Sequence, residues 1–219
     1  MFESVTVIGS GGRAGSAIAA RLRERGVSVG SDGDLRLLCV PDRAIAEVAR
    51  GIEPGPWVAH VSGATPLAAL EPHARRFSVH PLQTLVHGRG PEQLDGAWGA
   101  VTAESEEARR HALWLAETLG LRPFALPDDK RALYHAGAAV ASSFLVTLYR
   151  TAGAMLTEAG APPEVLVPLM QRTIENGFEL TGPIVRGDWQ TIERHLAAIR
   201  EDVPHLEHLY RTLTEATRA

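Results

Sequence analysis

The sequence is poor in cysteine and has no block of like charges. Cys39 is the only cysteine among 219 residues, which excludes an internal disulfide framework and a metal site built from cysteines. No spacing of His, Cys, Asp and Glu fits another metal site. The 22 basic and 26 acidic residues are interspersed, so we expect no surface that neutralises nucleic-acid phosphates.

The sequence also lacks an apolar run of about 18 residues, the length needed to cross a bilayer, and we expect no membrane contact. Its first residues, MFESVTVIG, carry an acid before a short apolar strand, whereas a signal peptide begins with basic residues and a longer apolar stretch. We therefore expect a cytoplasmic protein. With 45% hydrophobic residues, the chain has enough apolar material for a sizeable core.

Over residues 1–126, short β-rich runs alternate with helical patterns. The predicted strands are Ser4–Ile8, Leu35–Val40, Val58–Val61, Phe77–His80, Ala97–Thr102 and a run near Phe124. The predicted helices are Ala14–Arg25, Arg43–Ala49, Leu67–Ala74 and Ser105–Leu119. This alternation is typical of the α/β class, and we predict a doubly wound parallel sheet with a truncated Rossmann-like topology.

Over residues 127–219 the pattern is helical throughout. Pro127–Asp129 is a helix-start signal. The predicted helices are Arg131–Ala159, Glu164–Leu180, Trp189–Arg200 and Pro204–Arg218. Small residues from Ala136 to Ser143 allow another helix to approach closely, either within the chain or across a dimer. The break at Thr181–Pro183 opens a loop that either reaches a cleft or only caps a turn.

A glycine-rich turn follows the first predicted strand and leads directly into a helix. Its residues are Gly9, Ser10, Gly11, Gly12, Arg13 and Ala14, followed by Gly15. Glycines let the backbone approach a phosphate, and the free amides of a helix N-terminus favour negative charge. The dinucleotide fingerprint fits in two registers, Gly9–Ala14 and Ser10–Gly15, and we expect the turn to be one residue longer than usual. We favour a phosphate-binding turn over a purely structural one.

The segment after the first predicted helix is short for a dinucleotide fold. In such folds a second parallel strand ends in an acid about 20 residues past the glycines, where it holds the adenosine ribose. Asp32 and Asp34 lie near that distance, but the next strand begins at Leu35. A parallel crossover needs about a dozen residues. We therefore interpret Val27–Asp34 as a loop. We expect the second strand and its acid, which together support the adenosine ribose and are called the adenosine shelf here, to be missing.

Polar residues follow two strands at the predicted carboxyl edge, where open α/β sheets bind ligands. His80 ends one strand, and a histidine there can give a proton to a substrate oxygen or imine near neutral pH. Its alternative role is to anchor the turn that follows. Ser62 and Gly63 follow a neighbouring strand, and they either border a ligand or simply form a strand-to-helix turn.

The chain resembles a known family in motifs spread over nearly its whole length. These motifs are VIGSGGRAGSAIAARL, LLCVPDRAIAEVA, HVSGATPLAAL, FSVHPLQT, LPDDKRALYHAGAAVASSF and LTGPIVRGD. They are similar to the Rossmann-like proteins that bear the DUF2520 helical domain, relatives of pyrroline-5-carboxylate reductase and of the 6-phosphogluconate dehydrogenase-like group. The resemblance implies a nicotinamide-dependent oxidoreductase fold whose all-helical C-terminal domain forms a homodimer. Ser143 departs from the pattern, because an Asn is more usual there.

The same resemblance implies where a cofactor lies. NADP or NAD would rest on the turn Gly9–Ala14 and against Val40 and Pro41, and Ser62 would border the nicotinamide or the substrate. Because the segment behind the turn is truncated, we expect the adenosine ribose to be held loosely.

Catalytic roles also follow from the resemblance. In the wider dehydrogenase group, a basic residue near the start of the matching helix is a general acid. His135 would supply that proton, with Lys130 as a rival and an inert helix histidine as the alternative. Ser142, seven residues further along the predicted helix, would fix the substrate from the same face.

Two functions therefore remain open. The first is an NAD(P)-dependent oxidoreductase that reduces a small carbonyl or imine in an interdomain cleft, with His80 and His135 as proton donors. The second is a degenerate Rossmann-like protein that binds a small anionic molecule, or acts on it without redox chemistry. The glycine turn and the run from His80 to Thr84 favour the first, and the missing adenosine shelf favours the second. We keep the reductase ahead.

Overall fold

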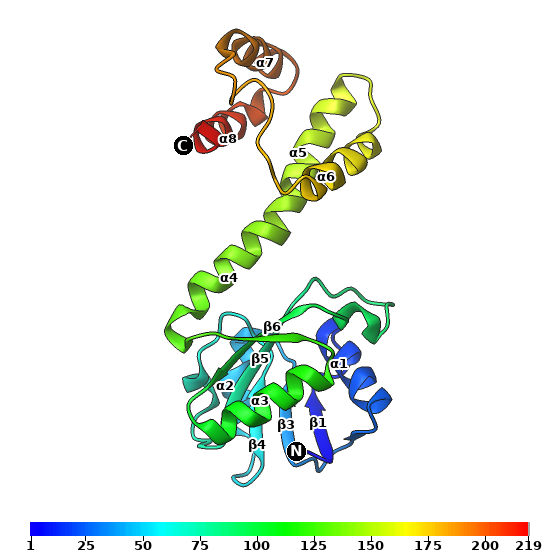
Figure 1. Ribbon diagram of the computed structural model, residues 1–219, viewed down its shortest axis with the longest axis vertical. Coiled ribbons are helices and arrows are strands. Elements are labelled where there is room, and N and C mark those ends of the chain that lie inside the picture. Colours follow the sequence, from blue (N-terminus) through cyan, green and yellow to red (C-terminus); the bar gives the residue numbers. More distant parts are fainter. Residues whose placement is uncertain (219) are drawn as a thin grey trace. The chain divides into compact units, whose positions relative to one another are not determined.

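The computed structural model describes residues 1–218 and divides the chain into two compact units (Figure 1). The first unit covers Met1–Val140 and contains the sheet, while the second begins at Ala141 and is helical. The helix α4 (Arg131–Ala139) follows the last strand and belongs to the first unit.

A seven-stranded sheet forms the centre of the first unit. Its strands are β1 (Ser4–Ile8), β2 (Ser28–Val29), β3 (Leu35–Leu38), β4 (Trp57–His60), β5 (Arg76–Leu82), β6 (Trp98–Ala103) and β7 (Arg122–Ala125), in the order β2-β1-β3-β4-β5-β6-β7. The α/β class and the parallel sheet are confirmed, with one departure from the prediction: β6 runs antiparallel to β5. The connection between them contains only the short 3₁₀ turn η2 (Pro91–Leu94), so the chain turns back instead of crossing over.

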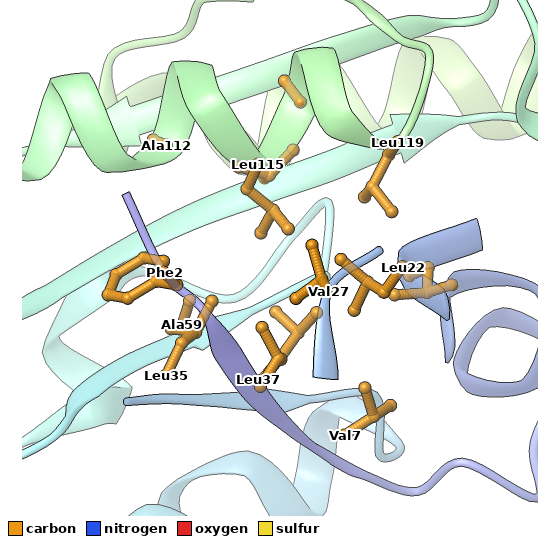
Figure 2. Close-up of a cluster of buried hydrophobic side chains, with 14 of the residues drawn as sticks. Phe2, Val7, Leu22, Val27, Leu35, Leu37, Ala59, Ala112, Leu115 and Leu119 are labelled. Carbon is orange, nitrogen blue, oxygen red and sulfur yellow. The ribbon is translucent and has the colours of Figure 1, made fainter. Parts of the chain in front are cut away.

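Helices cover both faces of the sheet, which confirms the doubly wound arrangement. On one face α1 (Arg13–Glu24) and α3 (Glu106–Thr118) pack against the strands, and Figure 2 shows Leu22 and Leu115 in this core beside Leu37. On the other face α2 (Asp42–Arg50) and the 3₁₀ turn η1 (Leu67–Leu70) cover Leu38. Leu37 and Leu38 therefore lie in opposite cores, one on each face of the sheet. Because both faces are buried, β3 is apolar except at Arg36.

One predicted helix of this unit is shorter in the structure. The segment Leu67–Ala74 forms only η1, because Pro72 has no N–H to extend a helix.

The interpretation of Val27–Asp34 as a loop is also wrong, since this segment contains β2. Ser28 and Val29 pair in parallel with Ser4 and Val5, at the beginning of β1. The strand β3 starts opposite the same Val5. Because β2 stops level with the start of β3, the chain does not have to return along the length of the sheet, and a short crossing suffices.

Gly33 makes that short crossing possible. A Cβ atom at Gly33 would lie 2.5 Å from the amide nitrogen of Thr6 and 2.5 Å from the carbonyl carbon of Val5. The amide of Gly33 donates a hydrogen bond to Oγ1 of Thr6, at 2.9 Å. The crossing segment therefore lies directly on the backbone of β1, where a side chain has no room.

A π-helical turn (Val140–Phe144) begins at the last residue of the first unit. The helical unit then contains α5 (Leu145–Glu158), α6 (Leu166–Glu175), α7 (Trp189–Asp202) and α8 (Glu207–Arg218), with 3₁₀ turns at Pro163–Val165 and Pro204–Leu206. The helix predicted to reach Leu180 ends at Glu175, because Gly177 and Phe178 both take positive φ angles. Asp188 caps α7 by accepting the amide hydrogen of Thr191, which supports the capping role for the end of this loop.

The helical segment Asp128–Glu158 is more apolar than the sequence analysis supposed. It contains 31 residues, and an 18-residue window in it reaches a mean hydropathy of 1.3. By length and composition alone it could cross a membrane, although a helix that packs against protein gives the same signal. Its apolar residues are interspersed with Ala, Gly and Ser, which is why no long apolar run is visible in the sequence.

We expect Gly33→Ala to destabilise the first unit by about 1–3 kcal/mol, because the new methyl group overlaps the backbone of β1. The matched control is Gly30→Ala, in the same crossing, where a Cβ atom meets nothing within 4 Å. Urea unfolding measures both variants. Equal stability for the two would contradict the close crossing over β1.

Candidate functional site at the carboxyl edge of the sheet

The glycine turn after β1 is held by two close approaches of the backbone. Gly9 has a φ of +92°, and a Cβ there would lie 2.5 Å from the carbonyl oxygen of Cys39. A Cβ at Gly15 would overlap the carbonyl oxygen of Gly9. The packing glycines are therefore Gly9 and Gly15, one position further apart than in G-x-G-x-x-G. The extra residue in the turn is confirmed, but neither predicted register pairs these two glycines.

The turn ends in an open helix N-terminus. Gly12 is the N-cap of α1, no side chain caps this end, and the first turn holds no acidic residue. Ser10, Gly11, Gly12 and Arg13 are exposed, with Ala14 half-buried behind them. The first amides of a helix have no acceptor within it, so together with Arg13 they form a site suited to a phosphate.

The residues predicted to lie against the cofactor are partly brought to this turn. Val40 follows β3, and its Cγ1 lies 3.2 Å from the point where a Cβ on Gly9 would be. Pro41 is the N-cap of α2 at the same edge. Ser62 follows β4, but its Oγ already accepts the amide hydrogens of Ala64 and Thr65. The side chain of Ser62 therefore shapes the strand-to-helix turn.

Asp32 and Asp34 have the sequence spacing of a ribose-binding acid, but they lie at the opposite end of the strands from the glycine turn. Asp34 accepts a hydrogen bond from Oγ of Ser4, at 2.8 Å, and directly precedes the start of β3. Asp32 is exposed, 3.7 Å from the guanidinium of Arg36. Neither carboxylate lies beside the glycine turn, which follows the opposite end of β1.

Side chains from β5 and α4 meet at the carboxyl edge. Nδ1 of His80 lies 2.8 Å from Oη of Tyr134, and the rings of His80 and His135 are 6.1 Å apart. Gly63 lies between the two histidines, because a Cβ there would be 2.7 Å from Cδ2 of His135 and 2.9 Å from Cε1 of His80. The structure therefore brings His80, His135 and Gly63 together, and adds Tyr134 to them.

Arg131 anchors α4 to this edge. Its side chain is fully buried, and its guanidinium donates hydrogen bonds to the carbonyl oxygen of Ser62, to Oγ of Ser78 at 2.9 Å and to Oγ1 of Thr102 at 2.8 Å. These acceptors belong to β5, β6 and the turn after β4. Tyr134 and His135 follow Arg131 by three and four residues, so the anchored helix face is the one that carries them.

Burial and the Arg131 cation keep the nearby histidines neutral. Burial, His135 and Arg131 lower the pKa of His80 to about 4, while Asp42 opposes the shift. Burial, Arg131 and His80 lower the pKa of His60 to about 3, and its Nδ1 accepts the amide hydrogen of Ser62. At neutral pH, His80 is therefore an uncharged imidazole, which has one ring nitrogen that can donate a hydrogen bond and one that can accept.

Burial acts on the phenol as well, and raises the pKa of Tyr134 to about 12. The nearby cation of Arg131 works in the opposite direction. The phenol is therefore protonated at neutral pH and has a proton to give.

Other predicted residues lie apart from this cluster. Lys130 is exposed and pairs with Asp129 at 2.9 Å, as expected for a neighbour of a helix start. Ser142 lies in the π-helical turn of the helical unit. The predicted role of Ser142 required an uninterrupted α-helix from His135, so that both side chains share one face. The π-helical turn interrupts that α-helix. The role of Ser142 stays a prediction.

The sequence analysis overlooked Arg131, Tyr134 and the buried His60. The signal for the first two was available, since they share a helix face with His135 directly after the helix start. His60 gave no such signal, because it ends an apolar strand and its burial depends on η1 covering that face.

This fold and this edge define a protein of the Rossmann-like α/β class. Residues 97–217 match the model of a domain of unknown function, DUF2520, which is more than half of the chain. The chain therefore belongs to the DUF2520 family. The matched range includes β6, α3 and β7 as well as the helical unit, so the family model begins within the sheet.

Solved structures with similar folds extend over nearly the whole chain. The candidate NADP oxidoreductase BF3122 from Bacteroides fragilis is 23% identical, with a TM-score of 0.81 over 99% of this chain and 98% of that one. Protein TM1727 from Thermotoga maritima is 23% identical, with a TM-score of 0.78 over 98% and 96%. A reductive aminase from Aspergillus terreus, solved with NADPH and ethyl levulinate, is 16% identical, with a TM-score of 0.65 over 100% and 94%. A search of curated proteins finds no match.

The lowered pKa of His80 predicts a pH dependence of stability. Between about pH 4 and 6.5 the unfolded state binds a proton at His80 and the folded state does not, so folding weakens as the pH falls. From pH 7 to pH 5 this costs about 1–2 kcal/mol. Urea unfolding of His80→Gln should lose that part of the dependence. His87→Gln, in an exposed loop, is the control, and identical pH profiles for His80→Gln and wild type would contradict the prediction.

Proposed function

We propose that the protein is an NAD(P)-dependent oxidoreductase that reduces a small carbonyl or imine at the carboxyl edge of its sheet. The observation that carries this proposal is the glycine turn, which runs into the uncapped N-terminus of α1 on the same edge as the His80–Tyr134 pair. The similarity of fold to a reductive aminase solved with NADPH supports it. We further propose a cytoplasmic location and a relation to the 6-phosphogluconate dehydrogenase-like group.

The residues of the turn fit a dinucleotide diphosphate. A side chain at Gly9 or Gly15 would close the turn, while a Cβ at Gly11 meets nothing within 4 Å. The amides of residues 10–14 and the guanidinium of Arg13 would hold the diphosphate, with Val40 and Pro41 beside it. When bound, the reduced nicotinamide supplies a hydride.

The adenosine half of the cofactor is the weak part of this site. The strand β2 ends at Val29, opposite Val5, and the chain then crosses β1 toward β3. No residue of this crossing continues β2 to the edge where the glycine turn lies. We therefore propose that the chain binds the adenosine ribose loosely and distinguishes poorly between NADPH and NADH.

The same observation favours a second candidate function. If the adenosine half contributes too little binding energy, the turn would hold a smaller phosphorylated or anionic molecule instead. The neutral imidazole of His80 and the phenol of Tyr134 would then serve binding or non-redox chemistry. Titration with the full dinucleotides separates the two functions.

The helical unit supports the proposal of a homodimer. It exposes large apolar side chains, among them Phe144, Leu169, Ile174 and Phe178, which are 52–69% accessible. Exposed apolar surface of this extent is typical of an interaction site. A second copy of the chain is the partner we propose, because both copies would then bury their long apolar helices.

Calorimetric titration with NADPH and NADH tests the cofactor. We expect micromolar binding of both, within about tenfold of each other, because neither Asp32 nor Asp34 lies beside the glycine turn. Arg13→Glu should weaken binding by about tenfold or more, since it replaces a cation near the diphosphate with an anion. Arg23→Glu, exposed near the C-terminus of the same helix, should leave binding unchanged.

Absence of heat with folded wild-type protein would contradict the reductase and favour the second function. Equal effects of the two arginine variants would place the ligand away from the glycine turn.

Light scattering tests the homodimer. We expect wild type to have twice the mass of one chain and Leu169→Glu to shift it to the monomer, because a buried charge opposes packing of apolar faces. Gln171→Glu, an exposed position on the same helix, is the control. A monomeric wild type in buffer would contradict the dimer, and recovery only in membrane fractions would assign the apolar helix to a bilayer.

A further inference from the structure

We propose that Tyr134 is the group that protonates the substrate and that His80 returns a proton to it, so that the two side chains form a relay. This inference rests on the proposed reductase function and assigns the proton donor differently from the sequence analysis, which favoured His80 and His135. Three features of the first unit support it: the contact between the two side chains, the anchoring of α4, and the partial exposure of His80.

The contact between the two side chains is direct. Oη of Tyr134 lies 2.8 Å from Nδ1 of His80, a distance at which a proton passes along a hydrogen bond. The phenol ring lies between two others, with its centroid 5.6 Å from that of His80 and 5.9 Å from that of Phe124. Tyr134 is half-buried, so its hydroxyl is fixed by packing while the side chain remains reachable at the edge.

Arg131 places a permanent positive charge behind this pair. It lies one helical turn before Tyr134 and is tied to three neighbouring segments of the sheet edge. A phenolate formed at Tyr134 is stabilised by this cation, and protonation of His80 is opposed by it. The other charged or titratable groups that act on His80 are His135 on α4, His60 on β4 and Asp42 at the start of α2.

The imidazole of His80 packs directly on the backbone of Gly63. A Cβ at Gly63 would lie 3.0 Å from Nε2 of His80 and 2.7 Å from Cδ2 of His135, so a side chain at this position has no room. His80 itself is only half-buried, and His135 beside it is exposed. The imidazole can therefore exchange protons with solvent.

The proton balance of the relay is simple. The carbonyl carbon of the substrate accepts a hydride from the reduced nicotinamide, and the electrons of the carbonyl π bond move to the oxygen. That oxygen takes the proton of Tyr134. The phenolate then takes the proton from Nδ1 of His80, and Nε2 takes a proton from solvent. The imidazole changes tautomer and remains neutral, so no cationic histidine is needed. Exchange of the ring protons with solvent restores the tautomer protonated at Nδ1 before the next turnover.

The relay requires that Nδ1 of His80 carries the proton in the resting protein and donates it to Oη of Tyr134. Nitrogen-15 NMR of wild type measures this directly, without turnover. We expect a protonated Nδ1 and an unprotonated Nε2 at pH 7, and loss of this tautomer preference in Tyr134→Phe. A wild-type His80 protonated at Nε2 alone would overturn the relay.

Kinetics give the second test, with NADPH and a panel of small ketones and aldehydes. Tyr134→Phe should lower kcat by about 100-fold or more, with the calorimetric Kd for NADPH unchanged within about twofold. Tyr210→Phe is the matched control, because it removes a hydroxyl 2.7 Å from Nδ1 of His195 in the helical unit. His135→Asn should retain most of the rate.

The outcomes separate the two proposals. Absence of hydride transfer by wild type with every substrate overturns the reductase and the relay with it. Hydride transfer by Tyr134→Phe at the wild-type rate overturns only the relay. A large loss confined to His135→Asn would return the role of acid to His135.

Discussion

The arrangement of the candidate site depends on one buried cation. Arg131 is the first residue of α4, and its guanidinium binds the turn after β4, the middle of β5 and the end of β6. A buried cation is costly unless its hydrogen bonds are satisfied, and these acceptors satisfy most of them. Because the anchor is rigid, the next turn of the helix is fixed above the carboxyl edge. Tyr134 and His135 meet His80 for this reason.

The second constraint is the short crossing from β2 to β3. In a complete dinucleotide fold, a longer connection carries the chain along the full length of the sheet and back. In this chain the short crossing takes the place of that connection. Gly33 makes the short crossing possible, since its backbone lies directly on β1. The edge has the glycine turn, whereas β2 ends opposite Val5, far from that edge. The proposed cofactor is therefore held mainly by its central phosphates and its nicotinamide half.

Much of this fold was predictable from the sequence, because strands and helices of the first unit alternate with clear turn signals. The glycine turn, Val40 and His80 were placed at the correct edge, since strands of a parallel sheet end there together. The strand β2 was missed because the usual crossover length excludes it, and only the register at Val5 resolves the conflict. The strand β6 was predicted, but its antiparallel direction was missed, because the residues between β5 and β6 give no signal for a strand direction.

The contacts of the site were less predictable than its location. His80 and Tyr134 are 54 residues apart, and no local pattern relates them. The lowered pKa of His80 depends on burial and on Arg131, whose own burial follows from packing of α4 on the sheet. Sequence patterns indicate which residue types reach an edge, whereas charge states depend on which of them become buried together.

The central claim is that the glycine turn and the Arg131-anchored face of α4 form one nicotinamide-dinucleotide site. Backbone amide NMR of the full chain, titrated with NADPH, tests it most directly. The account predicts saturable shifts at residues 9–14, at Val40, at Gly63 and around Tyr134, with residues near Trp114 on the opposite edge unchanged. Saturable shifts confined to other parts of the chain, or none at millimolar NADPH, would contradict it.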